Sequence, residues 1–145
     1  MLGAINTIEP LLPAFCSRKR GRIVVLASIA AYRGLPDSPG YCASKAGLRT
    51  YAEALRTRLG PYGVGVTVVC PGFFDSPMTD RFEGPTPFRF SIDRAARIVK
   101  QGVDRGRRRI TFPWPLVLGL RFCDMVPAIV GDAILRGYRF RIRAA

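Results

Sequence analysis

Three side chains near the start of the sequence could together move a proton. Tyr41 and Lys45 are four positions apart, so on a helix they lie on the same face, one turn apart. A free phenol has a pKa of about 10 and exchanges protons poorly near neutral pH, but a neighbouring ammonium group and the positive end of a helix both favour the phenolate. The hydroxyl of Ser28 could donate a hydrogen bond to a carbonyl oxygen or accept one from an alcohol. The three residues predict a proton-transfer site.

The absence of histidine narrows the chemistry further. It excludes a Ser-His-Asp triad, a Cys-His pair and a His-ligated metal site, so a general acid or base must be Tyr, Lys, Asp, Glu or Cys. We predict no metal site. The four cysteines form no CxxC pair, which favours four separate thiols in a reducing compartment and hence a cytoplasmic location. They are Cys16, Cys42, Cys70 and Cys123.

Helices and strands are predicted to alternate around these residues. Apolar residues at helical spacing predict helices over residues 2–18, 41–59 and 92–102. Apolar runs rich in β-branched residues predict strands, the first of them covered on both faces, over residues 22–27, 63–70 and 109–112. Loops are expected over residues 28–40 and 73–91, with one or two short apolar helices after Pro115. This order predicts an α/β fold with three parallel strands and right-handed crossovers.

The predicted fold brings the chemical groups to one edge of the sheet. Ser28 directly follows the first predicted strand, and Tyr41 opens the helix that leaves the same edge. Pro71 and Gly72 directly follow the second predicted strand. Since ligands of open parallel sheets bind outside the carboxyl ends of the strands, these residues are expected to share one site.

Two stretches of sequence resemble the short-chain dehydrogenase/reductase family. They are GRIVVLASIAAYRGLPDSPGYCASKAGL and GVGVTVVCPGFFDSPMT. In that family a Ser lies thirteen positions before the Tyr of a Tyr-x-x-x-Lys motif, and Ser28 and Tyr41 have this spacing. The resemblance covers residues 2–79 well and is looser beyond them.

The resemblance implies an oxidoreductase that uses NAD or NADP and interconverts a secondary alcohol and a ketone. Tyr41 would be the general acid/base, Ser28 would orient and polarise the substrate, and Lys45 would favour the phenolate and bind the nicotinamide ribose. Besides Tyr41 and Lys45, the residues expected at the cofactor are Pro71, Gly72, Phe74 and Ser76. The fold would be part of a Rossmann-like, doubly wound domain. Residues 1–112 would form its catalytic half and residues 113–145 an apolar and basic helical tail.

The glycine-rich turn that holds the dinucleotide pyrophosphate in this family is absent from the sequence. The glycines of GPYGVG at residues 60–65 have another spacing and precede a predicted strand. We therefore interpret the sequence as the C-terminal half of a dehydrogenase, truncated before the helix at residues 2–18, and expect it to be weakly active or inactive alone. The alternative is a natural half-length protein with another role.

The charge is strongly positive and uneven. The formal net charge is +13, and residues 86–145 carry 13 basic and 4 acidic side chains. This basic half of the sequence can be a surface exposed to water, or it can contact an anionic membrane. The sequence has no nucleic-acid recognition motif, so no nucleic-acid partner is predicted. The apolar stretch Ile110–Leu120 with Trp114 suits peripheral contact at the inner face of a membrane and a lipid-like substrate. Further along the tail follow Arg136, Arg139, Arg141 and Arg143.

No transmembrane span is predicted, because Arg121 ends the longest apolar stretch of the tail well short of about 20 residues. By resemblance, the helices over residues 2–18 and 41–59 would pair in a homo-oligomer of the full-length form. A second candidate role is therefore a non-catalytic or membrane-associated partner that uses these helices and the basic tail.

Overall fold

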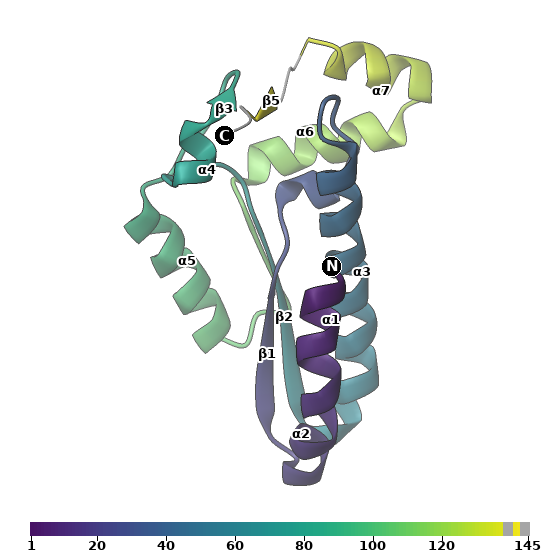
Figure 1. Cartoon of the computed structure of the whole chain (residues 1–145), viewed down its shortest axis with the longest axis vertical. Helices are drawn as coiled ribbons and strands as arrows, with labels where there is room; N and C mark the ends of the chain where they lie inside the picture. The colour runs from purple at the N-terminus through teal and green to yellow at the C-terminus, as the bar shows by residue number, and fades with distance from the viewer. Residues whose placement is uncertain (138–140, 143–145) are drawn as a thin grey trace.

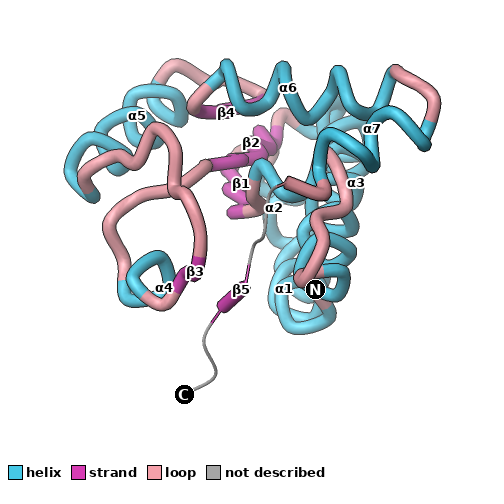
Figure 2. Tube along the Cα trace, turned by 90° about the horizontal axis from the view of Figure 1, so that it is seen from above, coloured by secondary structure: helices cyan, strands magenta, loops and turns pink. Residues whose placement is uncertain are grey.

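A parallel sheet of three strands lies at the centre of the computed structural model, which describes residues 1–137 and 141–142. The strands are β1 (Gly21–Leu26), β2 (Val64–Pro71) and β4 (Arg109–Phe112), with β2 in the middle. The helices α1 (Leu2–Ile8), α2 (Leu12–Arg18) and α3 (Pro39–Leu59) cover one face, and α5 (Ile92–Asp104) lies on the other (Figures 1 and 2). This confirms the predicted α/β fold with three parallel strands and flanking helices.

The middle strand β2 is buried on both faces, which explains its almost unbroken apolar sequence. Val66 and Val68 face α3 and join the main core, whereas Val69 points to the opposite face and packs with Ala95 of α5. Side chains of adjacent residues alternate between the two faces of a strand, so this one strand supplies both cores. Its carboxyl end is thereby held rigidly beside the ends of β1 and β4.

The edge strand β1 differs from the sequence-based expectation. Ile23 and Val25 are buried against the helices, but Val24 and Leu26 on the other face are exposed. The prediction that both faces are covered is wrong for β1, because α5 packs on β2 and β4 instead.

The predicted first helix forms as two helices joined by a short 3-10 segment, η1 (Glu9–Leu11). Pro10 and Pro13 stand in the first turns of η1 and α2, where a missing N–H costs no helical hydrogen bond. The segment stays straight enough to pack along α3 (Figure 1). The short η3 (Gly60–Tyr62) then links α3 to β2.

A hydrogen bond between Tyr51 and Glu9 ties η1 to α3. The Tyr51 hydroxyl donates to Oε1 of Glu9 over 2.9 Å. Burial of the ring, and then the hydrogen bond to the carboxylate, raise the pKa of Tyr51 from 10.0 to about 12.

This shift predicts a loss of stability at alkaline pH. Between pH 10.0 and about 12 the folded chain keeps a phenol proton that the unfolded chain has released, so the free energy of unfolding should fall as pH rises through this range. The Tyr51→Phe variant should lose less stability over the same range. Urea denaturation at a series of pH values measures the effect, with Tyr62→Phe as the control because Tyr62 is exposed. An unchanged pH dependence in Tyr51→Phe would contradict the assignment.

The segments outside the sheet contain more structure than the sequence predicts. The expected loop 28–40 includes η2 (Ile29–Ala31), and the expected loop 73–91 includes α4 (Pro77–Asp80) and the short strand β3 (Phe82–Glu83). Strand β3 pairs with β5 (Arg141–Ile142) in an antiparallel arrangement.

Two short helices follow the sheet, as predicted: α6 (Trp114–Met125) and α7 (Ala128–Leu135). Within residues 1–137 and 141–142, no helix is both long and apolar enough to cross a membrane. Arg139 and Arg143, two of the basic residues expected in the tail, lie outside the described residues. The boundary expected after residue 112 stays a prediction.

Candidate active site

Ser28 stands where the chain turns away from the end of β1. Its backbone is extended, and its Oγ accepts a hydrogen bond of 3.2 Å from the N–H of Ala30, so Ser28 caps the short segment η2. The residue is buried. This capping bond fixes the hydroxyl at the carboxyl edge of the sheet and leaves its proton free to be donated to a ligand.

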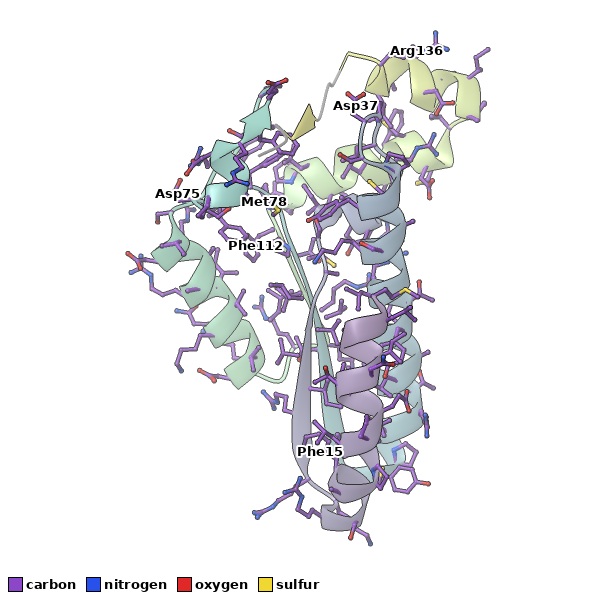
Figure 3. The ribbon with its side chains drawn as sticks, viewed as in Figure 1. Phe15, Asp37, Asp75, Met78, Phe112 and Arg136 are labelled. Carbon is purple, nitrogen blue, oxygen red and sulfur yellow. The ribbon has the colours of Figure 1, made fainter. Side chains whose placement is uncertain are left out.

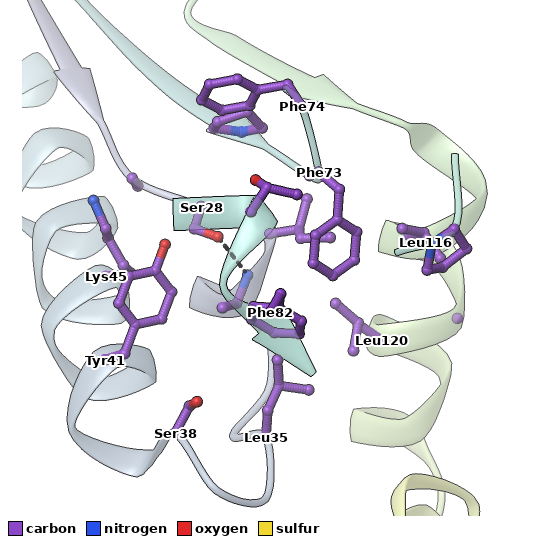
Figure 4. Close-up of a pocket in the computed structure, with 18 of the residues that line it drawn as sticks. Ser28, Leu35, Ser38, Tyr41, Lys45, Phe73, Phe74, Phe82, Leu116 and Leu120 are labelled. Carbon is purple, nitrogen blue, oxygen red and sulfur yellow. Dashed lines mark hydrogen bonds between the residues drawn. The ribbon is translucent and has the colours of Figure 1, made fainter. Parts of the chain in front are cut away.

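Tyr41 and Lys45 lie on α3 on the side that faces Ser28 (Figure 4). Tyr41 is in the first turn of the helix, close to its positive end. The Nζ of Lys45 lies 5.7 Å from the centroid of the Tyr41 ring, and it donates a hydrogen bond of 3.2 Å to the carbonyl oxygen of Leu26 at the end of β1. The strand thus holds the amine in place beside the phenol.

Lys45 is partly buried beside Tyr41. Desolvation lowers the pKa of Lys45 below its ordinary value, while the nearby Cys70 thiol acts in the opposite direction. A carboxylate partner would have tied up the ammonium group, but Lys45 has none among the described residues. Its remaining N–H donors can therefore serve a ligand.

A cavity of about 440 Å³ opens at this edge and brings the predicted residues together. Its lining includes six of the seven residues that the sequence singled out: Ser28, Tyr41, Lys45, Pro71, Gly72 and Phe74. The phenol oxygen of Tyr41 points into the space between Lys45 and Ser28 (Figure 4).

The seventh residue, Ser76, lies just outside the lining. Its Oγ caps α4 by accepting a hydrogen bond of 3.1 Å from the N–H of Thr79, and it lies 2.9 Å from Oγ1 of Thr79. Thr79 is buried and is part of the lining. The contact of Ser76 with a nicotinamide ring stays a prediction, and Thr79 presents a second hydroxyl close to that place.

A close backbone approach at Gly72 shapes the floor of the cavity. The N–H of Gly72 donates a hydrogen bond of 2.7 Å to the carbonyl oxygen of Phe112 at the end of β4. A Cβ at this position would come within 2.7 Å of Cδ of Pro113, a distance that forces a shift. Glycine is therefore required for the ends of β2 and β4 to meet here.

Sequence reasoning missed most of the apolar lining. The additional residues include Leu35, Met78, Thr79, Phe82, Leu116 and Leu120. The four-residue spacing of Leu116 and Leu120 on a predicted apolar helix could have indicated that the pair shares a face. Nothing in the sequence indicated that this face of α6 covers the cavity.

Arg33 forms ion pairs with both α6 and α7 beside the cavity. Its guanidinium donates to Oδ1 of Asp124 over 3.1 Å and to Oδ1 of Asp132 over 2.7 Å. These carboxylates raise the pKa of Arg33. One side chain following η2 therefore links both helices to the segment that carries Ser28.

Comparisons with known proteins identify the family of the chain. Residues 1–85 match the short chain dehydrogenase family, so the chain belongs to this family. It is 38% identical over 137 residues to an uncharacterized oxidoreductase of Myxococcus xanthus, a match covering 94% of this chain and 54% of the relative. It is 40% identical over 79 residues to retinol dehydrogenase 5 of Mus musculus, covering 54% of this chain and 24% of that protein.

A solved structure shares the fold. The crystal structure of a short chain dehydrogenase from Burkholderia cenocepacia in complex with NADP has a TM-score of 0.77 to this chain at 25% identity, covering 92% of this chain and 56% of the other. The chain therefore spans about half the length of the Myxococcus relative and of this structure. The matches confirm the predicted oxidoreductase family and give no support to a non-catalytic partner.

Proposed function

We propose that this chain carries the proton-transfer site of an NAD- or NADP-dependent oxidoreductase that interconverts a secondary alcohol and a ketone. The observation that carries the proposal is the convergence of Ser28, Tyr41 and Lys45 on one cavity at the carboxyl edge of the sheet. Family membership through residues 1–85 supports the same assignment.

The residues around the cavity fit the nicotinamide end of a dinucleotide. The half-buried ammonium of Lys45 keeps donors for ribose hydroxyls, and the apolar surfaces of Pro71 and Phe74 suit the flat face of a nicotinamide ring. The NADP complex of the Burkholderia relative supports a dinucleotide of this class. When bound, the cofactor would supply or accept a hydride at the carbinol carbon.

In the proposed reaction, the proton passes directly between Tyr41 and the substrate oxygen. During reduction, the Ser28 hydroxyl donates a hydrogen bond to the ketone oxygen, and the Tyr41 hydroxyl gives its proton to the same oxygen. The O–H bond of Tyr41 breaks as the O–H bond of the alcohol forms, and the ammonium of Lys45 stabilises the phenolate that is left. Oxidation of the alcohol reverses each step.

The cavity favours an apolar substrate. Leu35, Met78 and Phe82 line it, and Leu116 and Leu120 of α6 line it as well. Because Lys45 is the one charged side chain among the described residues of the lining, a bulky lipid-like alcohol or ketone is the substrate class that we propose. The similarity to a protein named for retinol supports this choice.

A homo-oligomer is part of the proposal for the full-length form. Leu2 of α1 and Leu11 of η1 are exposed, so the outer side of the first helical segment offers apolar surface to a second subunit.

A grafted enzyme tests the function. The chain replaces the matching 54% of the Myxococcus xanthus oxidoreductase, so that the relative supplies the remainder of the fold. We expect the grafted enzyme to reduce apolar ketones with NADH or NADPH. The 145-residue chain alone, which has no glycine-rich turn for the pyrophosphate, should bind either cofactor weakly and show little or no turnover.

Two results would count against the proposal. One is a grafted enzyme that folds, as judged by circular dichroism, yet neither reduces a ketone nor oxidises a secondary alcohol with either cofactor. The other is turnover by the grafted enzyme that prefers charged, hydrophilic substrates to apolar ones, which would reject the lipid-like class.

A further inference from the structure

Helix α6 is apolar on two opposite sides. Its inner side carries Leu116, Val117 and Leu120, which pack against the core or line the cavity. Its outer side exposes 70% of Trp114, 56% of Leu118 and 84% of Met125 to solvent. Folding therefore accounts for the inner apolar residues and leaves the outer ones without a covering element among the described residues.

The exposed residues form one continuous surface. Trp114, Leu118, Phe122 and Met125 follow each other at intervals of four, four and three residues, which places them on one face of a helix. Ile129, four positions after Met125 at the start of α7, is 77% exposed and adds a fifth exposed apolar side chain. We call these five residues the outer apolar face. Since Phe122 also borders the cavity, this face continues to the cavity rim.

The charges around the outer apolar face are positive. Residues 113–137 contain only two acidic residues, Asp124 and Asp132, and Arg33 pairs with both. Arg121 on α6 and Arg136 after α7 are exposed and make no ion pair with a described residue. Arg136 projects from the far end of α7 (Figure 3).

Exposed apolar side chains with basic residues beside them are suited to the interface of an anionic bilayer. Exposed Trp, Phe, Leu and Ile side chains enter the boundary between headgroups and acyl chains, while flanking arginines contact anionic headgroups. A second copy of the chain fits this face less well, because Arg121 and Arg136 would then lie against basic residues of the other copy.

We propose that the outer apolar face binds the surface of an anionic membrane, with α6 and α7 lying in the interface. The proposed membrane contact involves fewer residues than the stretch Ile110–Leu120 that the sequence indicated. Ile110 and Phe112 belong to β4 and are buried, so they cannot enter a membrane, and the contact begins at Trp114. It does not depend on the oxidoreductase activity, because membrane binding can be measured without turnover.

Trp114 provides the test, because it is the single tryptophan of the chain. The 145-residue chain is mixed with vesicles of phosphatidylcholine alone or with added phosphatidylglycerol, at low and high salt. We expect cosedimentation with the anionic vesicles, a blue shift of the Trp114 emission and quenching of that emission by brominated acyl chains. Binding should weaken as salt rises and should be at least about tenfold weaker to neutral vesicles.

Two substitutions at similarly exposed residues distinguish binding through the outer apolar face from nonspecific adsorption to vesicles. Leu118→Glu should weaken vesicle binding by at least about tenfold, because it places a carboxylate in the contact. Ile92→Glu, which changes an apolar residue of α5 that is 58% exposed, should leave binding unchanged. Circular dichroism checks that both variants fold, and the Trp114 signal of the unaltered chain tests the proposal without either variant.

Other outcomes would overturn the proposal. These are an unshifted Trp114 emission with anionic vesicles at low salt, equal binding to neutral and anionic vesicles, or equal losses in the two variants. A concentration-dependent dimer that shields Trp114 in the absence of lipid would likewise overturn it, because a second copy would then cover the face.

Discussion

We expect Tyr41→Phe to lower kcat of the grafted enzyme by about 10²–10⁴-fold, the range typical for loss of a general acid or base. Phenylalanine keeps the ring that lies 5.7 Å from the amine of Lys45 but has no proton to give to the substrate oxygen. The fold and the cavity should therefore survive while the chemistry is lost. Steady-state kinetics measure kcat, and fluorescence titration with NADPH measures the dissociation constant of the cofactor, which should change little.

Tyr62→Phe is the matched control for this variant. Tyr62 lies in η3 at the opposite end of the sheet, is exposed and takes no part in the cavity lining. Its replacement should leave kcat unchanged. Retained turnover in Tyr41→Phe would remove the tyrosine from the mechanism.

Lys45→Met should produce the second large effect, a loss of about 10²–10³ in kcat, as expected when one preorganised electrostatic group is removed. Methionine preserves most of the length of the side chain without its charge. Because the same amine is proposed to bind the ribose and to stabilise the phenolate, the dissociation constant of the cofactor should rise as kcat falls.

Lys100→Met provides the comparison. Lys100 lies on α5, where it pairs with Asp104 on the exposed side of the helix at a distance of 2.6 Å. Removing that surface pair should change neither kcat nor cofactor binding. If Lys45→Met weakened cofactor binding alone and left kcat intact, the role of the amine in proton transfer would be wrong.

Much of the fold could be predicted because local patterns and tertiary packing agree in it. The runs that became β1 and β2 contain β-branched residues in unbroken succession, and the helix that became α3 carries an apolar stripe ending at a Gly-Pro pair. The four-residue spacing of Tyr41 and Lys45 fixed their common face as soon as a helix formed there.

The remainder of the site depended on tertiary contacts that no local pattern encodes. The hydrogen bond from Lys45 to the carbonyl oxygen of Leu26 joins residues on separate elements. Thr79 reaches the cavity through a four-residue helix, which is too short to leave a periodic pattern in the sequence.

The structure of the tail could not be predicted from local sequence patterns either. The apolar stretch Ile110–Leu120 appears uniform in the sequence, but the structure divides it between the buried strand β4 and the two-sided helix α6. Only the packing of α6 over the cavity distinguishes Leu116, which faces inward, from Leu118, which faces solvent.

A crystal structure of the grafted enzyme with NADP and a tightly bound alcohol would test the proposed proton-transfer site most directly. We predict that the alcohol oxygen lies within about 2.5–3.0 Å of both the Ser28 Oγ and the Tyr41 hydroxyl, with the Lys45 ammonium against the ribose. An alcohol oxygen that contacts neither hydroxyl, in a cavity where cofactor and ligand are both well ordered, would contradict it.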